Sequence, residues 1–352
     1  MRELFRNTMS LTTEKPNALT TDRFAADVRN GLRQFHKQLP CKYIYDRHGA
    51  ELFNRICELP EYYPTWSETL ILQRYASQMA ELMGPYATII ELGSGSAMKT
   101  RLLLDRLHSP AVYIPVDISA EQLTVTAQSL SADYPHIIVH PIEADFTQPF
   151  ALPNFALPKL EPNTNHRTDG RHHRTIGQPI AGRRVIYFPG STIGNFEPPQ
   201  RSSLLSHLHR LAGPRGLLLI GIDLKKDPAI LHTAYNDKLG ITAAFNRNIL
   251  HRINRELAGS FVPSQFDHYA FYQPEYGRIE MHLVSHGRQT VHIADDEYEF
   301  AAGESLFTES SYKYDPYEFA DIAAEAGFSL QRMWLDDQRW FAVQLFQGRP
   351  SQ

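Results

Sequence analysis

Cysteine is scarce in this sequence of 352 residues, which contains only Cys41 and Cys57. The two thiols form neither a Cys-x-x-C pair nor another spacing that is typical of a metal site. Disulfide frameworks belong mainly to small secreted domains that are rich in cysteine. We therefore expect two free thiols in a reducing cytosol, and no metal centre.

Long apolar runs are also missing. The sequence has no stretch of about 18 apolar residues, which is the length that a membrane-spanning helix needs. Residues 1–7, MRELFRN, lack the apolar run of a secretory signal. We therefore expect no membrane association and a cytoplasmic location.

An excess of one charge is absent as well, because 35 Lys and Arg residues face 39 Asp and Glu residues, for a net charge of −4. No basic block indicates a nucleic-acid groove, so we expect no nucleic-acid partner. The hydrophobic fraction of 42% is sufficient for a large core in a chain of this length. The length favours about two domains, or one domain with insertions.

What the sequence does contain is an alternation of short apolar runs with helical segments. The expected strands cover residues 88–92, 112–116, 137–142, 184–188 and 217–221. Helical periodicity lies between them at 99–107, 120–130 and 201–211. Strands that alternate with helices of this length form a parallel sheet with helices on both faces.

Helical patterns precede the first strand, at 22–39, 51–58 and 66–83. The first of these has apolar residues at helical spacing, from Phe24 to Phe35. Residues 1 to about 20 are polar, and we expect them to be loose. Residues 155–182 are rich in proline, glycine and asparagine and predict an exposed insertion. We expect its histidines to be solvated rather than bound to a metal.

A different pattern begins after the fifth strand, with two helices and then strand-like runs, which predicts an inserted lobe. A helix at 316–326 and a hairpin at 328–346 follow. This ending is typical of the class I methyltransferase sheet, so we expect a Rossmann-like α/β fold with a C-terminal antiparallel hairpin and a smaller α+β substrate lobe. The expected domains are 22–226 with the sheet, 227–312 as the lobe, and 313–347 as the return to the sheet.

A glycine loop follows the first strand, in the segment Glu91-Leu92-Gly93-Ser94-Gly95. Two glycines allow a tight turn and the close approach of a ligand. A dinucleotide-binding loop would have a third glycine at position 98, where Met98 stands instead. Lys99, in the first turn of the next helix, offers a positive charge for the carboxylate of a methionine-like cofactor.

Polar residues stand at the ends of three further strands. Asp117 can accept both hydroxyls of a ribose. Asp145 can accept an adenine amino group, and the ring of Phe146 can pack on the base. The fourth strand ends in the segment 189–195, PGSTIGN. Any one of these aspartates could simply cap a helix, but the carboxyl ends of parallel strands are where such sheets bind ligands.

Ordered motifs along the chain resemble the L-histidine Nα-methyltransferases of ergothioneine biosynthesis. The similarity covers about residues 22–347, and the family pattern lacks a counterpart of 155–182. The motifs that carry it are Tyr45-Asp46, the segment 59–65 (LPEYYPT), the glycine loop with Lys99-Thr100-Arg101, Gly190 to Asn195, Asp223 to Asp227, Tyr235-Asn236-Asp237, Phe245-Asn246 and Glu309-Ser310-Ser311.

This resemblance implies a role for each matching residue. The residues implied to hold S-adenosylmethionine are Gly93, Lys99, Asp117, Asp145 and Phe146. Asn195 and Tyr235 would hold the substrate carboxylate, and Tyr45 would lie beside its amino group. Tyr62, Glu309 and Ser311 would recognise the imidazole. The family methylates histidine in successive steps to the trimethyl betaine hercynine.

These residue types suit the implied chemistry. An amine that attacks a methyl group needs a free lone pair, and hydroxyl and amide groups can orient it without a strong base. Glu309 can accept an imidazole N–H. The expected catalytic residues are Tyr45, Asn195 and Tyr235.

Other functions remain open at this point. The same enzyme class could act on another amino acid or an aromatic amine such as tryptophan, but Glu309, Ser311 and Met281 together favour histidine. The chain could be a cofactor-binding regulatory module, or a nicotinamide dehydrogenase, which Met98 disfavours. We expect a monomer with a small-molecule substrate.

Overall fold

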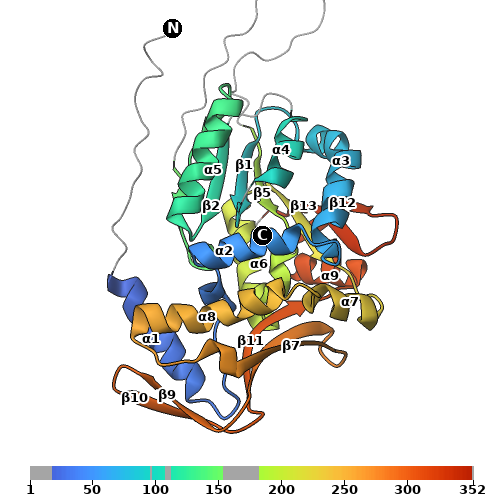
Figure 1. Ribbon diagram of the computed structural model, residues 1–352. Helices are drawn as coiled ribbons and strands as arrows, with labels where there is room; N and C mark the ends of the chain where they lie inside the picture. Colours follow the sequence, from blue (N-terminus) through green and yellow to red (C-terminus); the bar gives the residue numbers. More distant parts are fainter. Residues whose placement is uncertain (1–17, 96, 108–111, 154–181, 351–352) are drawn as a thin grey trace, which may run out of the picture.

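The computed structural model describes residues 18–95, 97–107, 112–153 and 182–350. Figure 1 shows a central sheet with helices on its two faces, above a second layer that contains α1, α8 and the strands β7–β11. Residues 1–17 and 155–181 lie outside the described part of the chain, and so do the expectations for the N-terminal segment and for the insertion at 155–182, of which only residue 182 is described.

The central sheet has the strand order β12-β13-β6-β5-β1-β2-β3, with β4 also paired to β2. The strands β1, β2, β5 and β6 pair in parallel, whereas β13 pairs with β6 and β12 in antiparallel fashion. This confirms the predicted class I methyltransferase sheet with a C-terminal hairpin. The strands are β1 Thr88–Leu92, β2 Val112–Asp117, β3 Ile138–Val139, β4 Ile142–Glu143, β5 Arg184–Phe188, β6 Leu217–Asp223, β12 Phe328–Leu335 and β13 Phe341–Gly348.

Helices cover both faces of this sheet because successive strand residues point to opposite sides. Ile89 packs in a cluster with α3, α4 and α5, and its neighbour Ile90 packs with α6 and α9. Both isoleucines are fully buried, as strands covered on both faces require. The helices are α3 Tyr63–Met83, α4 Met98–Leu104, α5 Ala120–Asp133, α6 Pro198–Ala212 and α9 Pro316–Glu325.

The lobe forms a third hydrophobic cluster, which also includes the N-terminal helices. Phe24 and Val28 of α1, and Leu52 of α2, pack with Leu231 of α7 and Ile249 of α8. The elements of this layer are α1 Ala18–Leu32, η1 Cys41–Ile44, α2 Arg47–Cys57, α7 Pro228–Tyr235, α8 Ile241–Leu257, η3 Pro263–Gln265, β7 Phe266–Gln273, β8 Arg278–Ser285, β9 Gln289–Ile293, β10 Asp296–Phe300 and β11 Ser305–Tyr312. Residues 24–63 therefore share the core of the lobe, although the predicted domain boundaries group them with the sheet.

Two predicted elements differ from the structure. The strand expected at 137–142 is split into β3 and β4, because Pro141 between them has no N–H to donate to the neighbouring strand. The first helix ends at Leu32 instead of continuing to 39, and Phe35 is 92% exposed. Its chain folds back at Gly31, where a Cβ would lie 1.9 Å from the carbonyl oxygen of Gln38.

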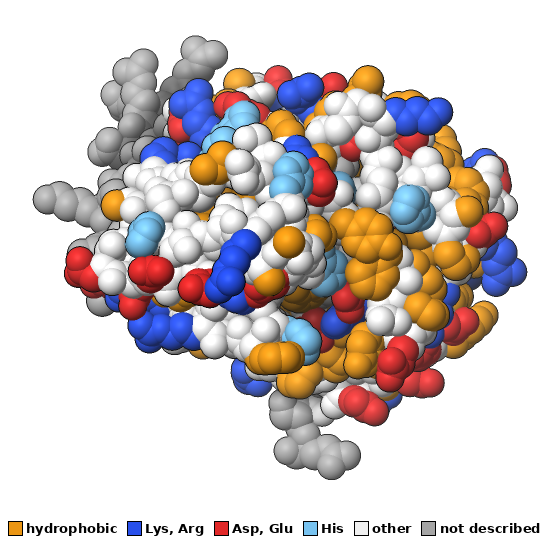
Figure 2. All heavy atoms as spheres, turned by 60° about the horizontal axis from the view of Figure 1, so that its bottom comes forward, with side chains coloured by type: hydrophobic (Ala, Val, Ile, Leu, Met, Phe, Trp, Pro, Cys, Tyr) orange, Lys and Arg blue, Asp and Glu red, His pale blue; other side chains and the backbone are white. Residues whose placement is uncertain are grey.

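The outer face of the lobe mixes charge and aromatic surface. Figure 2 shows basic and acidic side chains interspersed on this face, around groups of hydrophobic ones. On β7 and β8, the rings of Tyr269 and Phe271 stack with centroids 5.4 Å apart, and Phe271 stacks on His282 at the same distance. Among the described residues, no helix is both long enough and apolar enough to cross a membrane.

Asp46 fixes the start of α2, which carries part of the pocket described below. Its Oδ1 accepts hydrogen bonds from the Gly49 N–H at 2.8 Å and from Asn248 Nδ2 at 2.7 Å, and its Oδ2 pairs with Arg255. Gly49 is required here, since a Cβ would lie 1.7 Å from the Ile44 carbonyl oxygen. Asp46 thus caps one helix and ties it to α8.

Asp46→Ala should lower the free energy of unfolding by about 2 kcal/mol, because it removes a helix cap and two contacts to α8. Asp227→Ala is the matched control: Asp227 caps α7 through the Ala229 N–H alone, so the expected cost is about 1 kcal/mol. Urea denaturation of both variants measures the difference. An equal cost would show that the contacts to α8 contribute nothing.

Candidate active site

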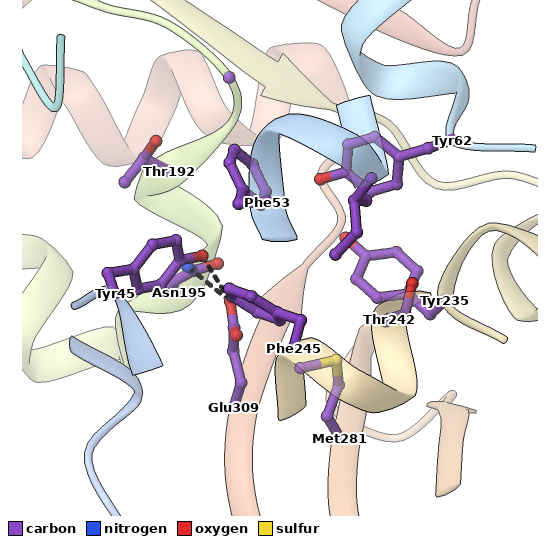
Figure 3. Close-up of a pocket in the computed structure, with 12 residues that line it drawn as sticks. Tyr45, Phe53, Tyr62, Thr192, Asn195, Tyr235, Thr242, Phe245, Met281 and Glu309 are labelled. Atoms are coloured by element: carbon purple, nitrogen blue, oxygen red, sulfur yellow. Dashed lines mark hydrogen bonds between the residues drawn. The ribbon is translucent and has the colours of Figure 1, made fainter. Parts of the chain in front are cut away.

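A pocket lies between the sheet and the lobe, near the carboxyl end of β5 (Figure 3). It encloses about 460 Å³, part of which is open to solvent. Its residues come from the segments just after η1 and just before α3, from α2, from the loop after β5 and the short helix η2 Thr192–Asn195, and from α7, α8, β8 and β11. The lining residues are Tyr45, Phe53, Ile56, Tyr62, Gly190, Thr192, Asn195, Tyr235, Thr242, Phe245, Met281 and Glu309.

Glu309 is the carboxylate of this pocket and is only 7% exposed. Its Oε1 accepts a hydrogen bond from Asn195 Nδ2 at 2.8 Å and a longer one from the Tyr45 hydroxyl at 3.4 Å. Its Oε2 has no hydrogen-bond partner among the described residues. Figure 3 shows Tyr45, Asn195 and Glu309 grouped on one side of the pocket, and Tyr62 and Tyr235 on the other.

A β-bulge places Glu309 at this position. Strand β11 pairs with β8 in a register that shifts between Phe307 and Glu309, and Glu309 then lies opposite Met281. Bulges bend a strand and redirect its side chains, and they are frequent beside active sites. Met281 lines the same pocket and is 2% exposed, so the carboxylate has an apolar neighbour.

Burial raises the pKa of Glu309 to about 8, against the opposing effects of the Tyr45 and Asn195 hydrogen bonds and of Lys313. A carboxyl group shifted in this way, inside a pocket, is a typical property of a functional site.

Asn195 reaches the pocket because the β5–η2 loop takes an unusual backbone path. Gly190 has a φ of 78° and Ser191 a φ of 56°, in the left-handed region that a non-glycine residue rarely adopts. The Ser191 hydroxyl accepts a hydrogen bond from the Asp223 N–H at 2.9 Å, which holds this conformation. Backbone strain of this kind is concentrated at ligand-binding sites. The helix η2, Thr192–Asn195, then delivers Asn195.

Tyr235, on the opposite side, belongs to a buried chain of polar groups. Its hydroxyl donates to Ser311 Oγ at 2.8 Å, and Lys313 Nζ donates to both oxygens, at 2.9 and 2.8 Å. Lys313 also pairs with Asp223 Oδ2 at 2.7 Å and is fully buried. Ser311 thus lies behind Tyr235 and outside the pocket lining.

The other side of Asp223 is equally well paired. Its carboxylate accepts hydrogen bonds from the Tyr63 hydroxyl at 2.8 Å and from Lys226 Nζ at 2.5 Å. Burial opposes the ionisation of Asp223, but Lys226 and Lys313 outweigh it and hold the pKa of that carboxyl below its ordinary value. Burial and the nearby Lys313 lower the pKa of Lys226 to about 8, although Asp223 opposes this.

The glycine loop after β1 leaves open space above it. Gly93 and Gly95 have φ values of 69° and 46°. A Cβ on Gly93 would meet only Phe146 at 3.9 Å, and one on Gly95 would meet nothing within 4 Å. The loop can therefore receive a ligand close to its backbone. Met98, at the start of α4, is 58% exposed.

Asp117, Asp145 and Phe146 lie at the neighbouring strand ends. Asp117 accepts hydrogen bonds from the N–H groups of Ser119 at 3.0 Å and Gly95 at 3.4 Å, yet burial raises its pKa. Asp145 accepts from the Thr147 N–H at 3.0 Å. The ring of Phe146 lies edge-on to Phe188 and Phe196. These side chains line one edge of the sheet, where an adenosine group can be held.

Lys99, which we expect to supply a positive charge beside the glycine loop, is paired with Glu68 of α3. Burial opposes the charged form of Lys99, but Glu68 outweighs it and raises the pKa. The Glu68 carboxylate also accepts the Gly190 N–H at 2.9 Å and is only 1% exposed. It connects the lysine beside the glycine loop to the loop that lines the pocket.

Six of the seven residues expected at the substrate line the pocket: Tyr45, Tyr62, Asn195, Tyr235, Met281 and Glu309. The sequence alone assigns no role to the other six lining residues, which are Phe53, Ile56, Gly190, Thr192, Thr242 and Phe245. Helical spacing marks Phe53 and Ile56 only as apolar positions, and Thr192 belongs to a motif that was noted without a role. Lys313, Glu68 and Asp223 were also missed, because their partners lie far away in sequence.

The sheet order, the glycine loop and the strand-end carboxylates define a class I S-adenosylmethionine-dependent methyltransferase. The sequence profile of the family described as "Histidine-specific methyltransferase, SAM-dependent" matches residues 24–348. This chain belongs to that family.

Individual relatives agree with this assignment. The histidine N-alpha-methyltransferase of Mycolicibacterium smegmatis is 38% identical over 324 residues, which cover 91% of this chain and 93% of the relative. Ergothioneine biosynthesis protein 1 of Neurospora crassa is 29% identical, over 85% of this chain and 32% of that longer protein. The 4-dimethylallyltryptophan N-methyltransferase of Epichloe festucae var. lolii is 27% identical, over 92% of this chain and 96% of that protein.

Glu309→Gln should become more stable than the wild type as the pH rises. Because the folded-state pKa of Glu309 is raised from 4.5 to about 8, the folded state binds more protons than the unfolded state between these values. The stability of the wild type therefore falls across this window. The gap in unfolding free energy should be near zero at pH 5 and on the order of a few kcal/mol at pH 9.

Glu304→Gln is the control for this measurement. Burial opposes ionisation of Glu304, but Lys37 and the Ala301 N–H outweigh it, so its pKa is lowered. Its gap to the wild type should stay constant between pH 6 and 9. A flat profile for Glu309→Gln over pH 5–9 would contradict the burial of an uncompensated carboxylate at position 309.

Proposed function

We propose that this protein transfers methyl groups from S-adenosyl-L-methionine to the α-amino nitrogen of L-histidine, in three steps that yield hercynine for ergothioneine biosynthesis. The observation that carries the proposal is Glu309, a buried carboxylate whose Oε2 lacks a partner while Oε1 is held by Asn195. An imidazole N–H of the substrate supplies the missing donor, and Met281 packs beside the ring. Tyr62 closes the pocket on the other side.

The cofactor site is supported by the shape and donor set of the sheet edge. Open space above Gly93 and Gly95 accommodates the methionine part of S-adenosyl-L-methionine. Asp117 would accept the ribose hydroxyls, and Asp145 with Phe146 would hold the adenine. Lys99 would share its charge between Glu68 and the carboxylate of the cofactor.

When bound, S-adenosyl-L-methionine supplies an electrophilic methyl group on a sulfonium. The neutral α-amine of histidine, once it has given up its proton, would accept this methyl group through its lone pair. The role of the protein is to position the amine in line. We assign this to Tyr45 beside the amine, and to Asn195 and Tyr235 at the carboxylate.

Aromatic side chains suit the product of the last step, which carries a fixed positive charge. Tyr45, Phe53 and Phe245 lie together in the pocket wall, with ring centroids 5.1–6.0 Å apart. Ring faces attract quaternary ammonium groups without requiring a hydrogen bond. A growing number of methyl groups on the nitrogen is therefore tolerated.

The alternative substrate, tryptophan or another aromatic amine, has weaker support. An indole has one ring nitrogen where an imidazole has two, so it offers a single hydrogen-bonding position to the polar groups of the pocket, and a site built to bind a polar group rejects analogues that leave it unpaired. The relative that acts on a tryptophan derivative is also less similar, at 27% identity against 38% for the histidine enzyme.

We also propose that the protein acts as a cytoplasmic monomer. A pocket that is built within a single chain is compatible with a monomer. Cys41 and Cys57 are free thiols, which suits a reducing compartment. Sedimentation equilibrium of the purified protein tests the oligomeric state.

The activity is tested by incubating the protein with S-adenosyl-L-methionine and each amino acid in turn, and by following mass. Histidine should gain 14 mass units per transfer, up to the trimethyl form (roughly 42 units), because its imidazole satisfies Glu309 and its amine reaches the methyl group. If tryptophan or another amine is methylated and histidine is not, the substrate assignment is wrong.

Glu309→Ala should reduce kcat/KM for histidine by about 100-fold or more, because a buried hydrogen bond to the ring is lost. Binding of S-adenosylhomocysteine, measured by calorimetry, should change less than about twofold, since Glu309 lies away from the glycine loop. Equal losses of substrate and cofactor affinity would remove the case for an imidazole-binding role.

A further inference from the structure

Lys313 is a fully buried cation directly behind the pocket wall. Its three N–H donors have three acceptors: Asp223 Oδ2 at 2.7 Å, the Tyr235 hydroxyl at 2.9 Å and Ser311 Oγ at 2.8 Å. Tyr235 lines the pocket, whereas Lys313 and Ser311 do not. Any influence of Lys313 on a bound molecule is therefore exerted through Tyr235 and Ser311.

Among the directly paired groups around Lys313, positive charges outnumber negative ones. These groups form a cluster that contains one carboxylate, Asp223, and two ammonium groups, Lys226 and Lys313, whose side chains are at most 4% exposed. Asp223 also receives the Tyr63 hydroxyl, which brings no charge. With both lysines protonated, the directly paired groups hold one positive charge more than Asp223 can balance; the carboxylates of Asp336 and Glu309 act on Lys226 and Lys313 only through space. In a poorly hydrated interior, such a charge favours an anion nearby.

A count of hydrogens shows how this charge is presented to the pocket. The hydroxyls of Tyr235 and Ser311 carry one hydrogen each, and one of the two lies in the hydrogen bond between them. Lys313 fills a lone pair on each oxygen. One hydrogen therefore remains: it lies on Ser311 while Tyr235 donates to Ser311, and on the pocket-facing Tyr235 when Ser311 donates instead. Because Lys313 fills a lone pair on each oxygen, it biases the pair toward donating to a ligand rather than accepting from it.

We propose that Lys313 is a positioning residue for recognition of the substrate carboxylate: it fixes the Tyr235–Ser311 pair as a hydrogen-bond donor and provides the buried positive charge opposite the anion. The inference rests on the proposed function, because it takes an α-amino acid as the substrate. Lys313 would thereby make the enzyme prefer substrates with a free carboxylate over analogues that carry a neutral group at the same position.

Lys226 provides a matched control within the same cluster. Its three donors go to Asp223, the Tyr63 hydroxyl and the Leu224 carbonyl oxygen, and none goes to Tyr235. Lys226→Met and Lys313→Met remove the same charge and leave Asp223 with one lysine each. They differ in whether the lost lysine contacts the Tyr235–Ser311 pair.

The experiment compares histidine with histidinamide, whose amide replaces one carboxylate oxygen with an N–H donor. Lys313→Met should raise the KM for histidine by about tenfold and reduce the preference for histidine over histidinamide by a similar factor. The KM for S-adenosyl-L-methionine should stay within about twofold. Lys226→Met should keep both the KM and the preference within about twofold of the wild type.

Equal effects of the two substitutions would overturn the role of Lys313 while leaving histidine methylation intact. A wild-type protein that does not methylate histidine would refute the proposed function, and the inference with it. Circular dichroism verifies that each variant folds. If Lys313→Met does not fold, Lys313→Gln is the second variant, because it retains an N–H donor without the charge. Its preference for histidine over histidinamide should be smaller than that of the wild type and of Lys226→Met, but should not vanish. A preference equal to that of the wild type would contradict the inference.

Discussion

The buried carboxylate of Asp223 joins the two halves of this protein. It stands at the end of β6, accepts the hydroxyl of Tyr63 at the start of α3, and pairs with Lys313 just after β11. Its N–H donates to the Ser191 hydroxyl, which holds the strained loop that leads to Asn195. One side chain and its own backbone thereby fix the relative positions of the sheet, the lobe and the pocket loop.

Such an arrangement is costly in the absence of full pairing, because a buried charge without partners destabilises a fold by several kcal/mol. Here each donor of Lys226 and Lys313 has an acceptor, so the cluster is well satisfied. Glu309 is the opposite case, since one of its oxygens has no partner and its pKa is raised to about 8. The contrast separates a carboxylate that supports the fold from one that is available to a ligand.

The fold could be predicted from the sequence because it depends on local signals. Alternating strands and helices, and a glycine loop after the first strand, give the sheet and its ligand-binding edge. The apolar periodicity predicts a first helix that is too long, because periodicity does not show that the chain turns back at Gly31. Pro141 similarly divides a run that reads as one continuous strand.

The pocket depended on the family resemblance, because its residues are brought together from segments far apart in the chain. Tyr45 and Glu309, for example, are 264 residues apart in the sequence but are joined by a hydrogen bond. No spacing rule indicates that Glu68 pairs with Lys99, or that Lys313 supports Tyr235. These contacts depend on how α3 and β11 pack against the sheet, which only the three-dimensional structure shows.

The two sides of the pocket would favour one orientation of a bound amino acid. Glu309 offers an unpaired acceptor on one side, and Tyr235, backed by Lys313, offers a donor with positive charge behind it on the other. A substrate with an N–H at one end and an anion at the other satisfies both sides in a single orientation. The reversed orientation would place the anion against Glu309 and the N–H against a donor. Histidine has this polarity, and its α-nitrogen would then lie between the two ends.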